Sequence, residues 1–225
     1  MKVSNPKGTQ DFLPAAAIPR RYVVDTLVRI FERFGFEPLE TPAFENLETL
    51  HGKYGEEGER LLFKILKRGE GGKAGEADLA LRYDLTVPLA RVVAQYPDLP
   101  RPFKRYQIAP VWRAEKPQRG RYREFWQCDV DVAGSTSGMV EIELLAMANE
   151  VYSSLGFEQF VIEINHRQLL TGLILAAGIP AEQEVSTLIS LDKLDKIGRD
   201  GVVAELQGKG LSSDQLQALD TLLFD

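Results

Sequence analysis

The sequence predicts an α+β fold, in which helices flank an antiparallel sheet and a helical segment follows toward the C-terminal end. Three observations predict it. Apolar residues recur at helical spacing on both sides of the middle of the chain. Residues 106–113 and 123–133 have the character of strands and are joined by a polar loop. Beyond Arg167 the pattern is mostly helical.

The first helix is predicted over residues 18–34. Four apolar residues recur three or four positions apart and form one stripe: Val23, Leu27, Ile30 and Phe34. Gly35 follows directly, as is typical of a residue that ends a helix. Residues 36–42 then contain Pro38 and Pro42, which a central strand does not tolerate. We therefore expect an edge strand there.

The next part of the chain contains a predicted loop, a short strand and a helix start. Residues 65–78 are rich in glycine and charge, which predicts a flexible loop. Residues 79–82 are predicted to form a short strand. Asp84 can cap the helix that follows, and Pro88 suits its first turn.

The two strands 106–113 and 123–133, with the polar loop 114–122 between them, are the most informative part of the sequence. Side chains alternate between the faces of a strand. One face of the second strand is mostly apolar and is predicted to lie in the core: Trp126, Cys128, Val130 and Val132. The other is polar: Phe125, Gln127, Asp129 and Asp131. Two interpretations stay open: a polar face exposed to water, or the floor of a pocket for a small cationic or zwitterionic ligand.

The remaining elements are predicted to be mainly helical. A helix over residues 138–155 ends at Gly156, and the alternation of Phe160, Ile162 and Ile164 predicts a further strand. Helices follow, with breaks at 178–180 and 208–213, and residues 213–224 form a helical tail. We expect residues 1–170 to form the main domain and 171–225 a helical segment.

Composition limits the classes of function. Among 225 residues, 44% are hydrophobic and 27% are charged, a globular balance. No apolar run is long enough to cross a bilayer, and the first residues do not resemble a signal peptide. These features predict a soluble, cytoplasmic protein. A single cysteine, Cys128, excludes an internal disulfide, and only two histidines, His51 and His166, argue against a metal site.

The net charge of −6 and the pI of about 5.2 argue against a protein that coats nucleic acid. Positive charge is nevertheless concentrated in the loop between the two strands: Lys116, Arg119, Arg121 and Arg123. Such a run forms either a solvated loop or a local site for anions. The sequence has neither a P-loop nor a dinucleotide fingerprint. A bound nucleotide would therefore depend on side chains such as arginine.

Several segments resemble a known family. Residues 35–44, with Pro42, resemble motif 1 of the class II aminoacyl-tRNA synthetases, and residues 111–115 and 121–127 resemble the more specific motif 2. Three further stretches are similar to the histidyl-tRNA synthetase family: residues 7–14, with Lys7 where arginine is commoner, residues 81–88 and residues 191–198. The resemblance covers nearly the whole chain and implies the class II antiparallel sheet.

The resemblance also implies roles for single residues. It implies that Arg113 is catalytic and holds both the α-phosphate of ATP and the carboxylate of histidine. It implies that Glu115 and Arg121 contact adenine and the outer phosphates, and that Phe125 stacks on adenine. The residues implied to bind L-histidine are Asp84, Thr86, Arg113, Gln127 and Asp131. Asp131 would face the imidazole ring, where a common bacterial pattern has glutamate.

By resemblance, the reaction is activation of L-histidine by ATP, with Mg²⁺, and transfer to the acceptor end of tRNA(His). Motif 1 implies a homodimer. The sequence stops at Asp225, before motif 3 and the anticodon-binding domain of the family, so we expect a fragment with weak or no activity. The alternative is a non-catalytic regulatory subunit of ATP phosphoribosyltransferase. The joint presence of Arg113, Glu115 and Arg121 favours the synthetase.

Overall fold

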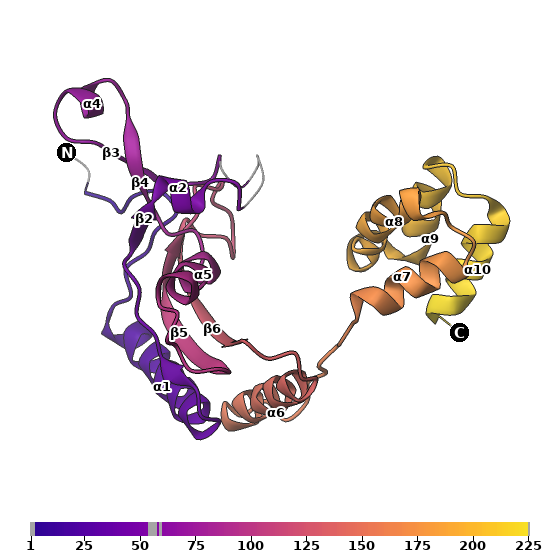
Figure 1. The fold of residues 1–225 in the computed structure, drawn as a ribbon, viewed down its shortest axis with the longest axis horizontal. Coiled ribbons are helices and arrows are strands. Elements are labelled where there is room, and N and C mark those ends of the chain that lie inside the picture. Colours follow the sequence, from indigo (N-terminus) through magenta and orange to yellow (C-terminus); the bar gives the residue numbers. More distant parts are fainter. Residues whose placement is uncertain (1–2, 54–57, 59, 225) are drawn as a thin grey trace. The chain divides into compact units, whose positions relative to one another are not determined.

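The computed structural model describes residues 3–53, 58 and 60–224. The chain divides into two compact units, Met1–Phe160 and Val161–Asp225 (Figure 1). The boundary expected at residue 170 from the sequence falls within helix α7 (Arg167–Ala176). Each unit has its own hydrophobic core.

Helix α1 (Pro14–Arg33) confirms the first predicted helix and begins a turn earlier, with a proline in its first turn. Gly35 follows with a φ of 76°, a conformation that glycine adopts without strain. Of the predicted stripe, Ile30 is buried, and Leu27 and Phe34 pack beside it. Val23 is 38% exposed, so the stripe enters the core only along the second half of the helix.

The principal sheet contains three described strands, in the order β1 (Glu37–Pro38), β5 (Phe103–Trp112) and β6 (Glu124–Ala133). Strands β5 and β6 pair antiparallel over their whole length, which confirms the predicted hairpin. Strand β1 pairs parallel to β5 at the edge and confirms the expected edge strand. Leu39 continues this connection, because its N–H donates to the Tyr106 carbonyl at 2.9 Å.

One face of the hairpin is covered by α1 and α6 (Met139–Ser154). The core between them contains Phe31, Tyr106 and Met147, with Val130 and Val132 packed against it. An ion pair between Arg33 and Glu150 also joins the two helices. The C-terminal half of the apolar face of β6 therefore lies in the core, as the sequence predicts.

The same face departs from the prediction at its other end. Trp126 and Cys128 were expected in the core, but Trp126 is 49% exposed and Cys128 is also exposed. Along β6 the core of α1 and α6 stops at Val130, and this core does not include the described residues at the beginning of β6. Arg20 of α1 lies over the Trp126 ring, 5.8 Å from its centroid, and covers it only in part.

The opposite, polar face of the hairpin receives the start of α5 (Thr86–Gln95). Asp84 Oδ1 accepts a hydrogen bond from the Val87 N–H at 3.0 Å, which confirms the predicted cap. Pro88 lies in the first turn, also as expected, and Leu85 is completely buried. The cap fixes the position of Asp84 above the sheet.

A second small sheet has the strand order β2 (Phe44–Asn46), β4 (Ala77–Leu81), β3 (Lys64–Leu66). The short helices α2 (Leu47–Leu50) and α4 (Glu70–Lys73) accompany it. The prediction of a flexible loop over residues 65–78 is wrong, because β3 pairs with β4 and α4 forms the turn. The turn contains the glycine residues and charged residues of this segment. An ion pair between Lys67 and Glu76, 3.2 Å apart, closes its base.

Arg82, directly after β4, ties the two sheets together. It is 4% exposed, its Nε donates to the Pro110 carbonyl at 2.9 Å, and its Nη1 donates to the Thr41 carbonyl at 2.8 Å. Burial lowers the pKa of the guanidinium, while Glu45 raises it. A single side chain thus connects β4, β5 and the segment around Pro42.

The predicted strand at residues 160–164 does not form in the described chain. Residues 157–166 carry no helix and no ladder pairing. Val161 and Ile164 are 84% and 74% exposed. The prediction of a strand here is therefore wrong, because no strand of the described residues pairs with this segment.

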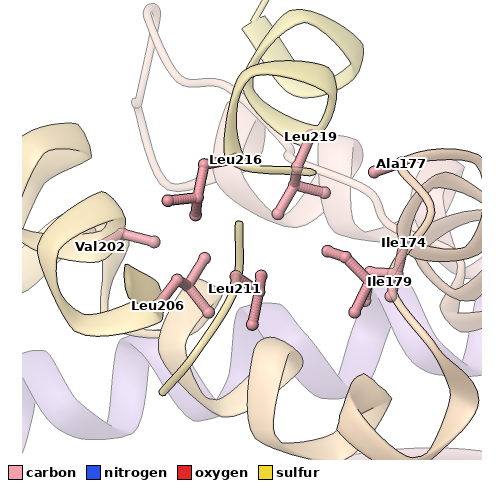
Figure 2. Close-up of a cluster of buried hydrophobic side chains, with 8 residues drawn as sticks. All are labelled: Ile174, Ala177, Ile179, Val202, Leu206, Leu211, Leu216 and Leu219. Atoms are coloured by element: carbon pink, nitrogen blue, oxygen red, sulfur yellow. The ribbon is translucent and has the colours of Figure 1, made fainter. Parts of the chain in front are cut away.

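The C-terminal unit is helical, as expected. It contains α7, the short 3₁₀ helix η1 (Ala181–Gln183), α8 (Glu184–Leu191), α9 (Leu194–Gly208) and α10 (Ser213–Phe224). Figure 2 shows the buried side chains of its core pointing toward one another: Ile174, Ala177, Ile179, Val202, Leu206, Leu211, Leu216 and Leu219. None of the helices in the described residues is both long and apolar enough to pass through a membrane.

Candidate functional site

The candidate site lies on the polar face of the β5–β6 hairpin. Four cross-strand pairs define this face: Arg105 with Asp131, Gln107 with Asp129, Ala109 with Gln127, and Val111 with Phe125. Because side chains at paired positions stand on the same side of an antiparallel sheet, they form one surface. Arg105 and Gln107 are almost fully buried within it, at 0% and 4% exposed.

Arg105 of β5 and Arg113, directly after β5, hold the segment that carries Asp84. Arg105 Nη2 donates to the Leu85 carbonyl at 3.2 Å. Arg113 Nε donates to the Tyr83 carbonyl at 3.3 Å. Asp84 lies between Tyr83 and Leu85 in the chain, so the two hydrogen bonds hold the backbone on either side of it. Thr86 is exposed in the first turn of α5.

Five charged groups interact across this surface. Asp131 Oδ2 lies 2.6 Å from Arg105 Nη2. Burial lowers the pKa of Arg105, and the negative charges of Asp131, Asp129 and Asp84 raise it. Burial likewise raises the pKa of Asp129, Arg105 lowers it, Asp131 and Asp84 raise it, and Arg113 lowers it. Three carboxylates and two guanidinium groups therefore interact electrostatically on this surface.

The same surface contains buried polar atoms whose hydrogen-bonding capacity is unused. Within the described residues, the buried side-chain atoms without a hydrogen-bond partner are Arg105 Nε and Nη1, Gln107 Oε1, Gln127 Oε1 and Asp131 Oδ2. All five belong to the polar face of the hairpin. Buried polar groups are nearly always satisfied. Their concentration here indicates a place for a polar ligand that offers several N–H donors.

A cavity of about 300 Å³ adjoins this surface at the loop end of the hairpin. Its lining residues are Arg113, Glu115, Gly120, Arg121, Tyr122 and Phe125. The Arg113 guanidinium carbon lies 4.4 Å from the centroid of the Tyr83 ring and 5.0 Å from that of Phe125. Across the loop, Arg121 lies 3.6 Å from the Glu115 carboxylate. Positive charge and aromatic faces in one cavity suit a phosphorylated, planar ligand.

A larger groove of about 670 Å³ runs along the second half of α1 beside Ser154. None of the buried unpaired atoms belongs to the residues that line it. The hairpin surface and its adjoining cavity are therefore the better candidate for a ligand site.

The N-terminal segment supports the base of the loop. The Arg123 N–H donates to the Gly8 carbonyl at 2.7 Å, and Arg123 Nε donates to the Glu115 carbonyl at 3.0 Å. Gly8 has a φ of 86°, and a Cβ added there would come within 2.8 Å of Arg123 Cγ and 2.9 Å of Pro117 Cγ. Glycine is thus required both by the backbone and by the space.

The structure brings together most of the residues selected from the sequence. Arg113, Glu115, Arg121 and Phe125 line one cavity. Gln127 and Asp131 share the adjoining face, and Asp84 interacts electrostatically with its charges. The described contacts do not link Thr86 to any of them.

Sequence reasoning missed Arg105, Gln107 and the ring of Tyr83. Alternation places Arg105 and Gln107 on one face of the first strand, just as it does for the second. Arg105 lies one residue before the predicted strand 106–113, and alternation alone does not reveal which residues lie opposite across the hairpin. The described residues contain no group of three or more His, Cys, Asp or Glu side chains arranged to hold a metal ion.

Comparison with known proteins gives a consistent result. A family model described as histidyl-tRNA synthetase matches residues 8–224. A histidine–tRNA ligase of Gloeobacter violaceus is 57% identical over 230 residues, which cover 94% of this chain and 49% of that protein. The crystal structure of histidyl-tRNA synthetase from Nostoc sp. PCC 7120 has a TM-score of 0.87 and 34% identity, covering 100% of this chain and 49% of the Nostoc chain.

A further solved structure shares the fold. It is described as an ATP phosphoribosyltransferase regulatory subunit/histidyl-tRNA synthetase from Bacillus halodurans C, with a TM-score of 0.78 and 23% identity over 96% of this chain and 54% of that chain. At this identity the likeness extends to the fold alone. The chain spans about half the length of the curated relatives it matches.

Proposed function

Because the chain belongs to the histidyl-tRNA synthetase family, we propose that it supplies part of the active site of a histidine–tRNA ligase. The reaction of the whole protein would join L-histidine to the α-phosphate of ATP, release pyrophosphate, and then pass the histidyl group to the 3′ end of tRNA(His). The relatives are about twice as long as this chain. The part described here would hold histidine and one side of ATP.

The observation that carries this proposal is the set of unpaired buried atoms on the hairpin face. Three of them are acceptors, on Gln107, Gln127 and Asp131. L-Histidine offers matching donors in its ammonium group and its imidazole N–H. We place the ammonium group near Asp84, Thr86 and Gln127, and the imidazole near Asp131.

Arg113 is the proposed catalytic residue. Its guanidinium stands where the polar face meets the cavity, between the Tyr83 and Phe125 rings. From there it can contact both the carboxylate of histidine and the α-phosphate of ATP. The carboxylate is already an anion and needs no protein base to attack phosphorus. Arg113 would stabilise the charge that grows on the phosphoryl oxygens during attack.

The cavity of about 300 Å³ suits ATP. Phe125 offers a ring face to adenine, and Glu115 a carboxylate that can accept from the adenine amino group. Arg121 would meet the outer phosphates. Mg²⁺ would enter bound to ATP phosphates.

Two partners are proposed on the same grounds. The exposed basic side chains of the loop beside the cavity would face the acceptor end of tRNA(His): Lys116, Arg119 and Arg121. A second copy of the chain would cover the exposed apolar part of α1 and β6, where Ile18, Tyr22 and Trp126 are 69%, 59% and 49% exposed. Burial of these residues would stabilise the homodimer that motif 1 implies.

The non-catalytic regulatory subunit considered from the sequence is less well supported. A protein that only senses histidine needs the polar face, but it does not need Arg113, Glu115 and Arg121 around one cavity. These three residues are explained by a nucleotide and by phosphoryl chemistry.

Titration with a non-hydrolysable analogue of histidyl-adenylate tests the proposal. The analogue occupies the amino acid and nucleotide parts together, so it reports on both. We expect binding by the chain, and a loss of about tenfold or more for Arg113→Gln, which removes a charge-assisted contact. Arg29→Gln, on the exposed side of α1, is the matched control. Absence of binding by the unchanged chain, or equal binding by Arg113→Gln, would contradict the proposal.

A further inference from the structure

We propose that Arg105 is a positioning residue for amino acid specificity: it holds the Asp131 carboxylate in the orientation that accepts the imidazole N–H of histidine. The inference rests on the proposed function, because it takes the hairpin face as the histidine site. Arg105 would act through Asp131 and would not contact the reacting atoms.

Burial is the first observation. Arg105 has no exposed surface, and it is the largest of the fully buried side chains among the described residues. Taking a guanidinium out of water costs free energy unless it gains a partner. Its carbonyl partner, Leu85, accepts from Nη2 alone. A structural arginine would be expected to use more of its five N–H donors on the protein, as Arg82 does with three carbonyls.

The second observation is the pairing with Asp131. The two residues are direct cross-strand partners on β5 and β6, and their side chains approach to 2.6 Å. The Asp131 side chain is 32% exposed, so part of the carboxylate is accessible from the open side of the floor. An aspartate in this position could otherwise turn toward water. The buried cation keeps it on the sheet while leaving one side available to a ligand.

The third observation is the set of polar atoms of this pair that lack a hydrogen-bond partner. Arg105 Nε and Nη1 are donors without partners, and Asp131 Oδ2 is an acceptor without an aligned donor despite its short distance to Arg105. The pair is therefore an ion contact whose hydrogen bonds are incomplete. A ligand that donates one N–H to the carboxylate, together with water held by the free guanidinium donors, would complete it.

The charges of the surroundings explain why this position requires a cation. Asp84 and Asp129 also interact electrostatically with Arg105, and burial raises the pKa of Asp129. Without Arg105, three carboxylates would face the ligand with Arg113 as the remaining guanidinium of this group. Asp131 would then be repelled by its neighbours, and the imidazole would lose a fixed acceptor.

The test measures affinity for L-histidine and for ATP separately by calorimetry on the full chain. Arg105→Met removes the charge but keeps a long side chain. We expect it to weaken histidine binding by about tenfold or more, since a charge-assisted contact is lost, and to leave ATP binding unchanged. Arg105→Lys should restore much of the affinity for histidine. Lys104→Met is the matched control, because Lys104 is the neighbouring cation on the opposite face, bound to Glu143 at 2.6 Å.

A double-mutant cycle decides whether Arg105 acts through Asp131. On an Asp131→Asn background, adding Arg105→Met should change histidine affinity by less than about twofold. This double variant also removes the unbalanced charge, so it serves if Arg105→Met alone does not fold. Equal and independent losses in the two backgrounds would overturn the inference, as would a parallel loss of ATP binding in Arg105→Met. If the unchanged chain binds ATP but no histidine, the proposed function is overturned first and this inference with it.

Discussion

The guanidinium of Arg113 lies between two aromatic rings, 5.0 Å from the centroid of Phe125 and 4.4 Å from that of Tyr83. The same guanidinium donates to the Tyr83 carbonyl through Nε at 3.3 Å, which fixes its direction. Arg113 also lines the cavity of about 300 Å³. The contribution of the Phe125 ring to ATP binding can be measured separately from that of the Arg113 charge.

Phe125→Leu should weaken ATP binding by about 1–2 kcal/mol, because an aliphatic side chain cannot offer a ring face to a base. Fluorescence titration with ATP and with inorganic pyrophosphate would measure it. Affinity for pyrophosphate should change little, since it has no base to stack. An equal loss for both ligands would mean that Phe125 only supports Arg113.

Gln127→Ala should weaken histidine binding by about 1–3 kcal/mol, because an ammonium group loses an acceptor. The fold should persist, because the amide oxygen of Gln127 has no partner to lose within the described residues. Calorimetric titration and a thermal melt of the same sample measure both quantities. A large fall in melting temperature without a change in affinity would place Gln127 in the core rather than in the site.

Trp126→Ala should reduce self-association more than it reduces stability. Trp126 is 49% exposed, so the substitution should cost the single chain about 1 kcal/mol, below the roughly 3–5 kcal/mol of a buried aromatic residue. Analytical ultracentrifugation at several concentrations would report the change in assembly, with Tyr152→Ala, a similarly exposed aromatic of α6, as control. A strictly monomeric unchanged chain at high micromolar concentration would contradict the proposed dimer.

Asp129→Asn should stabilise the chain near neutral pH. Burial raises the pKa of Asp129, so the folded chain holds this proton more tightly than the unfolded chain. Stability from this group is therefore present at low pH and is lost as the pH rises through the folded-state pKa. The difference in free energy of unfolding between variant and unchanged chain should grow from acidic to neutral pH in urea titrations. A constant difference would show that Asp129 is not the titrating group.

Glu205→Gln should make the helical unit less stable at neutral pH and less sensitive to acid. Hydrogen bonds from Lys193, Lys209 and Ser190 lower the pKa of Glu205 to about 2, although burial opposes the shift. The stabilisation is present above the ordinary glutamate pKa and is lost as the pH falls toward 2. Amide exchange of the α8 and α9 segments between pH 2 and 5 would follow this loss. Asp214→Asn, at the start of α10, is the control.

The elements that the sequence predicted well are those whose stability is local or whose pattern is long. The β5–β6 hairpin, α1 and α6 have strong periodicity and clear ends, and all three were found. The cap at Asp84 is likewise a contact between near neighbours. Residues 65–78 were misjudged because pairing with β4, rather than composition, decides that β3 forms.

The features that the sequence did not predict depend on contacts between elements, which the periodicity of one segment does not reveal. Trp126 stands in an apolar row, but the helices that cover Val130 do not reach it. Ile162 and Ile164 alternate as in a strand, but a strand also needs a neighbour. Arg105 was overlooked because its importance comes from Asp131 on the next strand, a pairing set by register.

The close fit around Gly8 restricts which sequences this fold can accept. Any side chain at that position would meet both Arg123 and Pro117, and the backbone there already has a conformation that other residues avoid. In a saturation library, position 8 should therefore be depleted of every substitution. Thr9, whose hydroxyl only donates to the nearby Pro6 carbonyl, should accept many. Variation at the start of the chain would thus be confined to the positions around one invariant glycine.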